Sequence, residues 1–282
     1  MKFIRYGELG KEKPGVIDAE GNIRDLSGLF PDITAVEIMQ GSQVGTCNIV
    51  PENLPLVNGQ PRLGVPYSGI QKIIGVGLNY SDHAAESNMA IPSEPILFSK
   101  AITSINGPQD NIVIPRDAKK VDWEVELGVV MGRQAKNVSE EEALSHVAGY
   151  CVVNDVSERE LQIERSSGQW FKGKGLDTFC PIGPYLVSRD EVPDPQTLSL
   201  WLEVNGVRRQ TGNTATMIFS VAYLIHYISR FITLMPGDLI ATGTPPGVGM
   251  GMSPPQYLHH GDLIELGIEG LGQQHQKTVV VA

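Results

Sequence analysis

The sequence predicts an α+β protein in which β-strands predominate. The chain of 282 residues contains 31 glycines and 19 prolines, a composition typical of many turns between short strands. Apolar and polar residues alternate over residues 121–127, as they do in a β-strand. A second alternating segment surrounds Asn205-Gly206, a dipeptide that favours a tight hairpin turn. One long helix is expected over residues 214–234, before Pro236-Gly237.

Two structural units are expected along the chain. Residues 1–65 are predicted to form a small β-rich domain, with a hairpin turn at Glu20-Gly21-Asn22. Residues 57–69, VNGQPRLGVPYSG, are dense in Gly and Pro and are typical of a linker. The larger domain therefore begins near residue 70 and extends to residue 282. A chain of this length can bury a full hydrophobic core.

The charge of the chain argues against polyanionic partners. The formal net charge is -10 and the isoelectric point is near 5.1. No basic excess is present to neutralise the phosphates of a nucleic acid or an anionic membrane surface. We therefore expect a small-molecule substrate, with no nucleic acid and no membrane as partner.

Other features favour a cytoplasmic location. The three cysteines have no CxxC spacing, which suits buried thiols in a reducing compartment better than a disulfide framework. The first ten residues, MKFIRYGELG, lack the apolar stretch of a signal peptide. Residues 217–235 are the most apolar segment, but His226 and Arg230 interrupt them, which predicts a buried helix and not a membrane span.

Two short helices are predicted from capping-box patterns. Ser139 with Glu142 would begin the first helix, and Ser157 with Glu160 would begin the second. Between them, residues 148–155, AGYCVVND, are predicted to form a strand.

The alternating strand carries acidic residues on one face. Glu124 and Glu126 share this face with Asp122, whereas Trp123 and Val125 lie on the other. Same-face side chains two residues apart lie about 6.5 to 7 Å apart, so Glu124 and Glu126 could hold one hard cation between them. The alternative is a solvated acidic face of an antiparallel strand.

A third carboxylate, that of Asp155, stands at the end of the next predicted strand. Strand ends commonly display functional side chains. Together with Glu124 and Glu126 it would complete an all-oxygen set, which suits Mg²⁺ or Mn²⁺. The alternative for Asp155 is a cap of the following helix.

A Gly-x-Gly turn is expected in residues 73–88, IIGVGLNYSDHAAESN. A dinucleotide-binding loop would need a third glycine at Tyr80 and a βαβ repeat, and neither is present. His83 and Glu86 are three residues apart, so on a helical turn they would share a face, and the acid could orient an imidazole base. An exposed pair without a role is the alternative.

Two further segments could contact a substrate. Lys172 and Lys174 lie in WFKGKGLDTFCP, a glycine-rich segment expected to be a loop, where a lysine could meet a substrate carboxylate or enolate oxygen. Solvated surface lysines are the alternative. Residues 241–251, ATGTPPGVGMG, lack the ending of a phosphate loop but could offer backbone amides and the Thr244 hydroxyl to an anion.

Six segments, in this order, resemble the fumarylacetoacetate hydrolase family. They are GVGLNYSDHAAE, VDWEVELGVVMG, GYCVVNDVSERELQ, KGKGLDTFCPIGP, MPGDLIATGTPPGVG and GDLIELGIEGLG. The resemblance covers the chain from about residue 70 to its end. It implies a mixed β-roll in the larger domain, a homodimer or higher homo-oligomer, and one Mg²⁺ or Mn²⁺ per subunit.

The resemblance also implies roles for particular residues. The metal ligands would be Glu124, Glu126 and Asp155. His83 and Glu86 match the pair that activates water. The positions that match the family's substrate contacts are Gln162, Lys174 and Thr244, and Lys174 would also take part in catalysis.

Within the family, the chain most resembles bacterial hydrolases of 2,4-diketo-3-deoxy sugar acids, of the L-rhamnonate or L-fuconate type. These imply cleavage of the C3–C4 bond of a 2-oxo acid to pyruvate and a hydroxy acid such as lactate. Acylpyruvate hydrolases, oxaloacetate decarboxylases, ureidoglycolate lyases and dienoate isomerases are the alternatives on the same fold. A non-catalytic β-rich binding module is the alternative of a different class.

Overall fold

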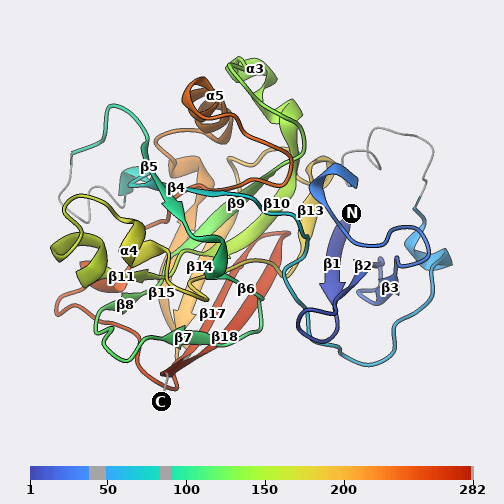
Figure 1. The fold of residues 1–282 in the computed structure, drawn as a ribbon, viewed down its shortest axis with the longest axis horizontal. Coiled ribbons are helices and arrows are strands. Elements are labelled where there is room, and N and C mark those ends of the chain that lie inside the picture. The colour runs from blue at the N-terminus through green and yellow to red at the C-terminus, as the bar shows by residue number, and fades with distance from the viewer. Residues whose placement is uncertain (38–48, 83–89, 281–282) are drawn as a thin grey trace.

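A nine-stranded mixed sheet forms the centre of the protein (Figure 1). The computed structural model describes residues 1–37, 49–82 and 90–280. Within them, β16 pairs parallel with β4, and the other neighbours in this sheet pair antiparallel. In spatial order the strands are β3 (Ile23–Asp25), β2 (Lys13–Ile17), β1 (Lys2–Tyr6), β13 (Leu186–Ser188), β10 (Val147–Asn154), β9 (Val125–Met131), β16 (Leu239–Ala241), β4 (Ile73–Gly77) and β5 (Ile96–Lys100).

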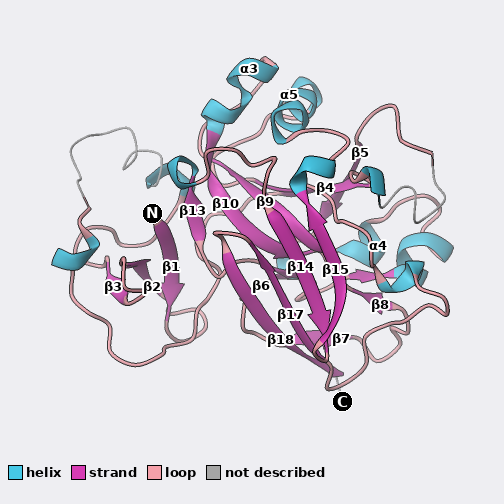
Figure 2. Cartoon of the chain, turned by 180° about the vertical axis from the view of Figure 1, so that it is seen from behind, coloured by secondary structure: helices cyan, strands magenta, loops and turns pink. Residues whose placement is uncertain are grey.

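A second sheet of five strands packs against the first (Figure 2). Its order is β15 (Val207–Asn213), β14 (Ser199–Val204), β17 (Leu263–Ile268), β18 (Gly272–Val280) and β7 (Ile112–Ile114). Leu127 of β9, Leu202 of β14 and Leu266 of β17 belong to one buried apolar cluster. The two sheets therefore share a hydrophobic core. Two short pairs complete the strands: β8 (Val121–Asp122) with β11 (Ser157–Glu158), and β6 (Ile105–Asn106) with β12 (Cys180–Pro181).

Helices are few and short. The α-helices that lie wholly within the described residues are α3 (Glu140–Ala143), α4 (Phe171–Lys174) and α5 (Val221–Phe231), with a π-helix at Glu160–Glu164. The 3-10 helices are Pro51–Asn53, Ile102–Ser104, Leu144–His146, Arg189–Glu191, Thr214–Thr216 and Gly249–Gly251. Helices α3 and α5 pack together at one end of the molecule (Figure 1). Among the residues that the structure describes, no helix combines the length and the apolar character that a membrane crossing requires.

Several local predictions are confirmed. Asn205 and Gly206 join β14 to β15 with φ angles of 52° and 73°, in the left-handed region that such a turn needs. The hairpin at residues 20–22 joins β2 to β3. The strand predicted at residues 148–155 is β10. Ser139 caps α3, since its side chain accepts the N–H of Glu142.

The expected helix over residues 214–234 is shorter than predicted. Ser220 caps α5 by accepting the N–H of Tyr223, so the helix begins at Val221. Met217 instead forms an isolated bridge with the buried Tyr80. Tertiary pairing therefore overrides the helical periodicity of residues 217–219.

The prediction of a capping box at Ser157 and Glu160 is wrong. Ser157 lies in β11, opposite Asp122, and its hydroxyl donates to the carbonyl of Asp155 at 3.0 Å. At the start of the π-helix, the carboxylate of Glu158 instead accepts the N–H of Leu161 at 2.7 Å. The Gly-x-Gly turn is also absent, because Gly75 and Gly77 lie within β4.

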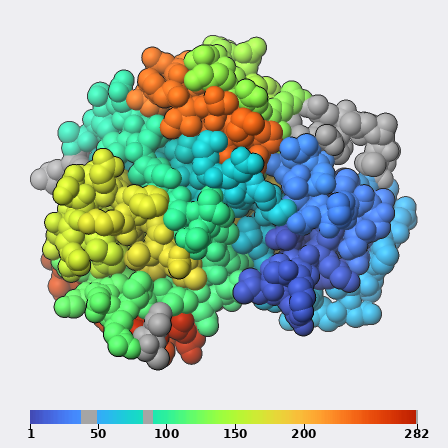
Figure 3. Space-filling model, viewed as in Figure 1, coloured from blue at the N-terminus to red at the C-terminus, as the bar shows by residue number. Residues whose placement is uncertain are grey.

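The N-terminal strands continue the central sheet. β1 pairs with β13 through Lys2 and Phe3, so β1 to β3 form one edge of the nine-stranded sheet. The space-filling view shows these residues as one flank of the molecule, opposite the flank that carries α4 (Figure 3). The boundary at residues 65–70 stays a prediction. Cys151 and Cys180 are free and buried, and Cys47 lies outside the described residues.

Candidate metal centre and active site

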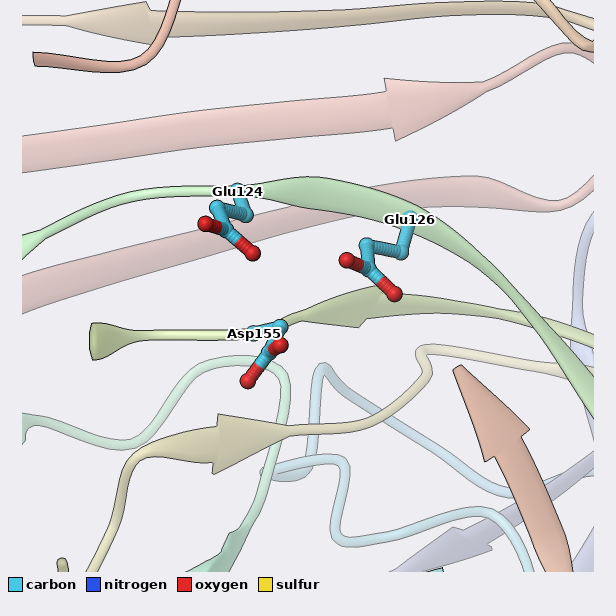
Figure 4. A group of neighbouring side chains, drawn as sticks. All are labelled: Glu124, Glu126 and Asp155. Carbon is cyan, nitrogen blue, oxygen red and sulfur yellow. The ribbon is translucent and has the colours of Figure 1, made fainter. Parts of the chain in front are cut away.

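The register of β9 and β10 brings three carboxylates together. The strands are antiparallel, with Asn154 opposite Val125, so the end of β10 meets the start of β9. One step beyond, the N–H of Asp155 donates to the carbonyl of Glu124 at 2.9 Å. Glu124 and Glu126 extend from one ribbon toward the neighbouring ribbon that carries Asp155 (Figure 4). One oxygen from each of the three lies within 4.8 Å of the others.

The acidic face of the predicted strand is buried. Glu124 is 6% exposed and Glu126 is 1% exposed, so the alternative of a solvated face is wrong. The strand is also interrupted, since β8 ends at Asp122 and β9 begins at Val125. Glu124 stands in this break, where its N–H donates to the side chain of Asn154 at 3.2 Å. Glu126 accepts the N–H of Gly243 at 2.9 Å.

Two lysines point into the carboxylate group. Lys174 Nζ lies 2.8 Å from Glu124 Oε2 and 2.7 Å from Asp155 Oδ2. Lys100 Nζ lies 2.5 Å from Asp155 Oδ1 and 3.2 Å from the carbonyl of Val156. Lys174 is the last residue of α4, so the prediction that it lies in a loop is wrong. Lys172 lies on the same helix and is exposed. The structure therefore selects Lys174 and separates Lys172 from the site.

Arg159 supplies a third cation that the sequence reasoning missed. Its Nη2 lies 2.7 Å from Glu124 Oε1, and its Nε lies 2.8 Å from Asp122 Oδ2. Its Nη1 donates to Gln162 Oε1 at 2.9 Å. The three-residue spacing of Arg159 and Gln162 was an available signal, because it places both on one side of a helical turn. Lys100 had no local signal, since it reaches the site from the other edge of the sheet.

Burial and charge act differently on the two glutamates. Burial opposes ionisation of Glu124, but the positive charges of Lys174 and Arg159 outweigh it and lower the pKa to about 2. Burial raises the pKa of Glu126 well above its ordinary range, and the negative charges of Asp155 and Glu124 raise it further. No described lysine or arginine forms an ion pair with Glu126. Glu126 is therefore a buried carboxylate without a described cationic partner.

The donor set fits a divalent metal. When Glu126 is ionised, the four carboxylates linked in this network (Asp122, Glu124, Glu126 and Asp155) face three cations (Lys100, Arg159 and Lys174), which leaves one negative charge in excess. A substrate carboxylate would make the excess two, and a divalent cation would neutralise it. Hard oxygen ligands select Mg²⁺ or Mn²⁺ over zinc.

A pocket of about 580 Å³ opens beside the carboxylates. Its polar lining is Glu124, Glu126, Arg159, Gln162, Lys174 and Thr244. No described residue accepts a hydrogen bond from Gln162 Nε2, which leaves this donor for a ligand. The Thr244 hydroxyl is occupied, because it donates to the carbonyl of Val125 at 2.9 Å and accepts from Gln210 at 2.8 Å. The structure thus places Gln162, Lys174 and Thr244 at the pocket. His83 and Glu86 lie outside the described residues.

The chain belongs to the fumarylacetoacetate hydrolase family. Residues 72–280 match the family model described as fumarylacetoacetate (FAA) hydrolase C-terminal. This match agrees with the strand-rich α+β fold, which is confirmed. A Burkholderia multivorans protein with a provisional hydrolase name is 59% identical over 279 residues, 99% of each chain.

Solved structures of the family have the same fold. The fumarylacetoacetate hydrolase of Exiguobacterium antarcticum is 38% identical, with a TM-score of 0.88 over 100% of both chains. The maleylpyruvate hydrolase of Sphingobium sp. SYK-6, in complex with manganese(II) and pyruvate, is 28% identical, with a TM-score of 0.82 over 100% of both chains. These relatives support a hydrolase, and one of them binds manganese. The buried carboxylates of this chain could hold a metal, and the comparison does not distinguish Mg²⁺ from Mn²⁺.

Proposed function

We propose that this protein is a divalent-metal-dependent hydrolase of 2,4-diketo acids. It would cleave the C3–C4 bond and release pyruvate. The substrate would be a 2,4-diketo-3-deoxy sugar acid of the L-rhamnonate or L-fuconate type, which also yields lactate and belongs to sugar acid catabolism. The observation that carries the proposal is the buried carboxylate triad, in which Glu126 has no described cationic partner, placed beside Lys174 in a pocket. The manganese and pyruvate complex of a family member supports it.

The polar side chains would bind and orient the 2-oxo acid. A divalent metal held by Glu124, Glu126 and Asp155 would supply Lewis-acid stabilisation of the charge that develops on the 2-keto oxygen. Burial lowers the pKa of Lys174, but the charges of Asp155 and Glu124 outweigh this and raise it, so the side chain stays an ammonium. Lys174 can therefore donate to the developing enolate oxygen, and Gln162 Nε2 can donate to the substrate carboxylate.

His83 would act as the general base, with Glu86 as its orienting acid. His83 takes a proton from water as the water oxygen bonds to C4. The C3–C4 bond then breaks, and its electron pair forms the enolate of pyruvate. The C4 fragment leaves as a carboxylic acid, and the proton held by His83 returns the enolate to pyruvate at C3. Both roles rest on the sequence resemblance.

The resemblance also leads us to propose a cytoplasmic homodimer or higher homo-oligomer. Light scattering of the purified protein measures the assembly. A monomeric mass at micromolar concentration would contradict it.

Pyruvate release from a panel of substrates tests the function. We expect turnover of 2,4-diketo acids, in preference to oxaloacetate, with Mg²⁺ or Mn²⁺ and none after chelation. His83→Ala should keep metal and oxalate binding but lose hydrolysis by about 10² to 10⁴-fold, the usual range for removing a general base. Full activity after exhaustive chelation would rule the mechanism out. Turnover of oxaloacetate or ureidoglycolate alone would assign the site to the decarboxylases or lyases instead.

A further inference from the structure

One part of the pocket lining is apolar, in contrast to the part formed by the carboxylates. We call this surface the apolar wall, and it consists of Ile96, Phe98, Ile163, Trp170 and Met250. Ile96, Phe98 and Trp170 are only half-buried in the structure. These side chains therefore have surface left to cover when a ligand enters.

Two glycines of β4 make room for the wall. Gly75 pairs with Phe98 and Gly77 pairs with Ile96 across the β4–β5 ladder. A Cβ on Gly75 would lie 2.2 Å from Phe98 Cζ, and one on Gly77 would lie 2.5 Å from Trp170 Cζ3. Both contacts are impossible without displacing a ring. The Gly-x-Gly of the sequence thus makes room for two aromatic side chains.

The wall begins directly beside the catalytic cations. Lys174 Nζ lies 4.9 Å from the centroid of the Phe98 ring. The Phe98 and Trp170 rings follow at 5.5 Å between centroids, inclined by 50°. A substrate whose 2-oxo acid end is held near Lys174 therefore extends its remaining carbons along these rings.

The described lining offers no unpaired cation to a second carboxylate. Its two cationic residues are Arg159 and Lys174, and both are ion-paired with Glu124. A carboxylate on the far end of a substrate would lose hydration without gaining a partner, which is unfavourable. A hydrocarbon group would gain from burial against the rings.

We propose that the apolar wall selects 2,4-diketo acids whose tail is uncharged and ends in a hydrocarbon group, and rejects those whose tail ends in a carboxylate. The inference rests on the proposed function and specifies its substrate class. A methyl-terminated deoxy-sugar tail meets this requirement. The selectivity would separate this protein from the 2-hydroxyhepta-2,4-diene-1,7-dioate isomerase of Mycobacterium abscessus, a structural neighbour whose name specifies a dicarboxylate.

A matched pair of substrates tests the selectivity. With Mn²⁺ present, kcat/KM for valerylpyruvate should exceed that for succinylpyruvate by about 100-fold or more, as expected when a site leaves a polar group of the poorer substrate unpaired. Calorimetric binding of 2-oxoheptanoate and 2-oxoadipate, which cannot be cleaved, should show the same order. These binding measurements test the selectivity independently of the proposed function, because binding does not require hydrolysis.

One exposed position of the wall allows the preference to be changed. Ile163 is 51% exposed at the pocket rim, so Ile163→Lys should fold normally. The new ammonium should raise the relative affinity for 2-oxoadipate by about fivefold, the size of a partly exposed ion pair. The control is Leu263→Lys, at 53% exposure on β17 and outside the pocket lining. It should leave the affinities for both 2-oxo acids unchanged.

The possible outcomes test the selectivity of the apolar wall separately from the proposed hydrolysis. Tighter binding of 2-oxoheptanoate without pyruvate release from either diketo acid would overturn the proposed function and keep the selectivity. Equal or tighter binding of 2-oxoadipate by the wild type would overturn the selectivity, even if both diketo acids are hydrolysed. An equal response of Ile163→Lys and Leu263→Lys would also overturn it, since the pocket position would then have no special effect.

Discussion

Two clusters of charged side chains join distant parts of this chain, and they differ in burial and in pairing. The site cluster joins the ends of β9 and β10 to α4 and β5 through Lys100, Glu124, Asp155, Arg159 and Lys174, with Glu126 beside them. The seam cluster joins the N-terminal strands to the rest of the chain through Arg5, Glu12, Asp32, Arg62 and Asp110.

Every carboxylate of the seam cluster has a guanidinium partner. Arg62 Nε lies 2.7 Å from Asp110, and its Nη1 lies 2.9 Å from Glu12. Arg5 Nε lies 2.7 Å from Asp32. Its arginine side chains keep 17% and 24% exposure, so water screens these pairs. The seam cluster is therefore suited to holding two parts of the chain together.

The site cluster is buried and incompletely paired. Lys100 and Asp155 are fully buried, and Glu126 has no described ion-pair partner. Buried charges interact more strongly and tolerate the loss of a partner less well than exposed ones. The comparison shows that the same residue types stabilise the fold where they are matched, and prepare a cation site where one carboxylate is left over.

The largest effect should follow from removing Lys100. Lys100→Met leaves Asp155 buried with only Lys174 as partner, so the free energy of unfolding should fall by about 3 to 5 kcal/mol. Urea unfolding of the ligand-free protein measures it. Lys11→Met, which removes an exposed pair with Glu8, is the control and should change stability by less than about 0.5 kcal/mol. Equal losses in the two variants would refute the role of burial.

Removing the unpaired carboxylate should separate stability from function. Glu126→Gln should lower pyruvate release and Mn²⁺ affinity by about 100-fold or more, since loss of a ligand exceeds the 10 to 100-fold cost of losing a supporting partner. Its ligand-free form should be more stable than the wild type at pH 8, because the amide avoids the charge repulsion. Calorimetric titration with Mn²⁺ and urea unfolding measure the two effects, and Glu269→Gln, at an exposed position, is the control. If ligand-free Glu126→Gln is less stable than the wild type, Glu126 is not a carboxylate that lacks a cationic partner.

A smaller effect is expected in the seam cluster. Arg62→Met should lower the free energy of unfolding by about 1 to 2 kcal/mol, between the values for exposed and buried pairs. Mn²⁺ affinity and pyruvate release by the folded variant should be unchanged, because Arg62 pairs with Glu12 and Asp110 and does not line the pocket at the triad. A parallel loss of metal affinity would show that the two clusters are coupled.

The smallest effect concerns the hairpin of β2 and β3. Burial opposes ionisation of Asp18, but hydrogen bonds from Arg24 and Asn22 outweigh it and lower the pKa from 3.8 to about 2. A lowered folded pKa stabilises the protein above the unfolded pKa, and this stability is lost as the pH falls from 3.8 to about 2. Asp18→Asn should therefore lower stability at pH 6, and the difference from wild type should shrink as the pH falls below 4. Urea midpoints across this range measure it, and a constant difference would exclude the ionised hydrogen-bonded carboxylate as its cause.

The sequence alone predicted the features that depend on neighbours along the chain. Glu124 and Glu126 share a face because side chains two residues apart in a strand point the same way, and Asp155 was identified from its place at a strand end. The Asn205-Gly206 hairpin followed from backbone preference in the same local way.

Only the tertiary structure decided which distant residues meet. Lys100 reaches the carboxylates from β5, and no local pattern reports this contact. Gly75 and Gly77 have the spacing of the first two glycines of a nucleotide-binding loop, but the register of β4 with β5 sets their part in the pocket. The physical reason is that side-chain periodicity acts within one element, whereas charge pairing and ring packing depend on the register between elements far apart in sequence.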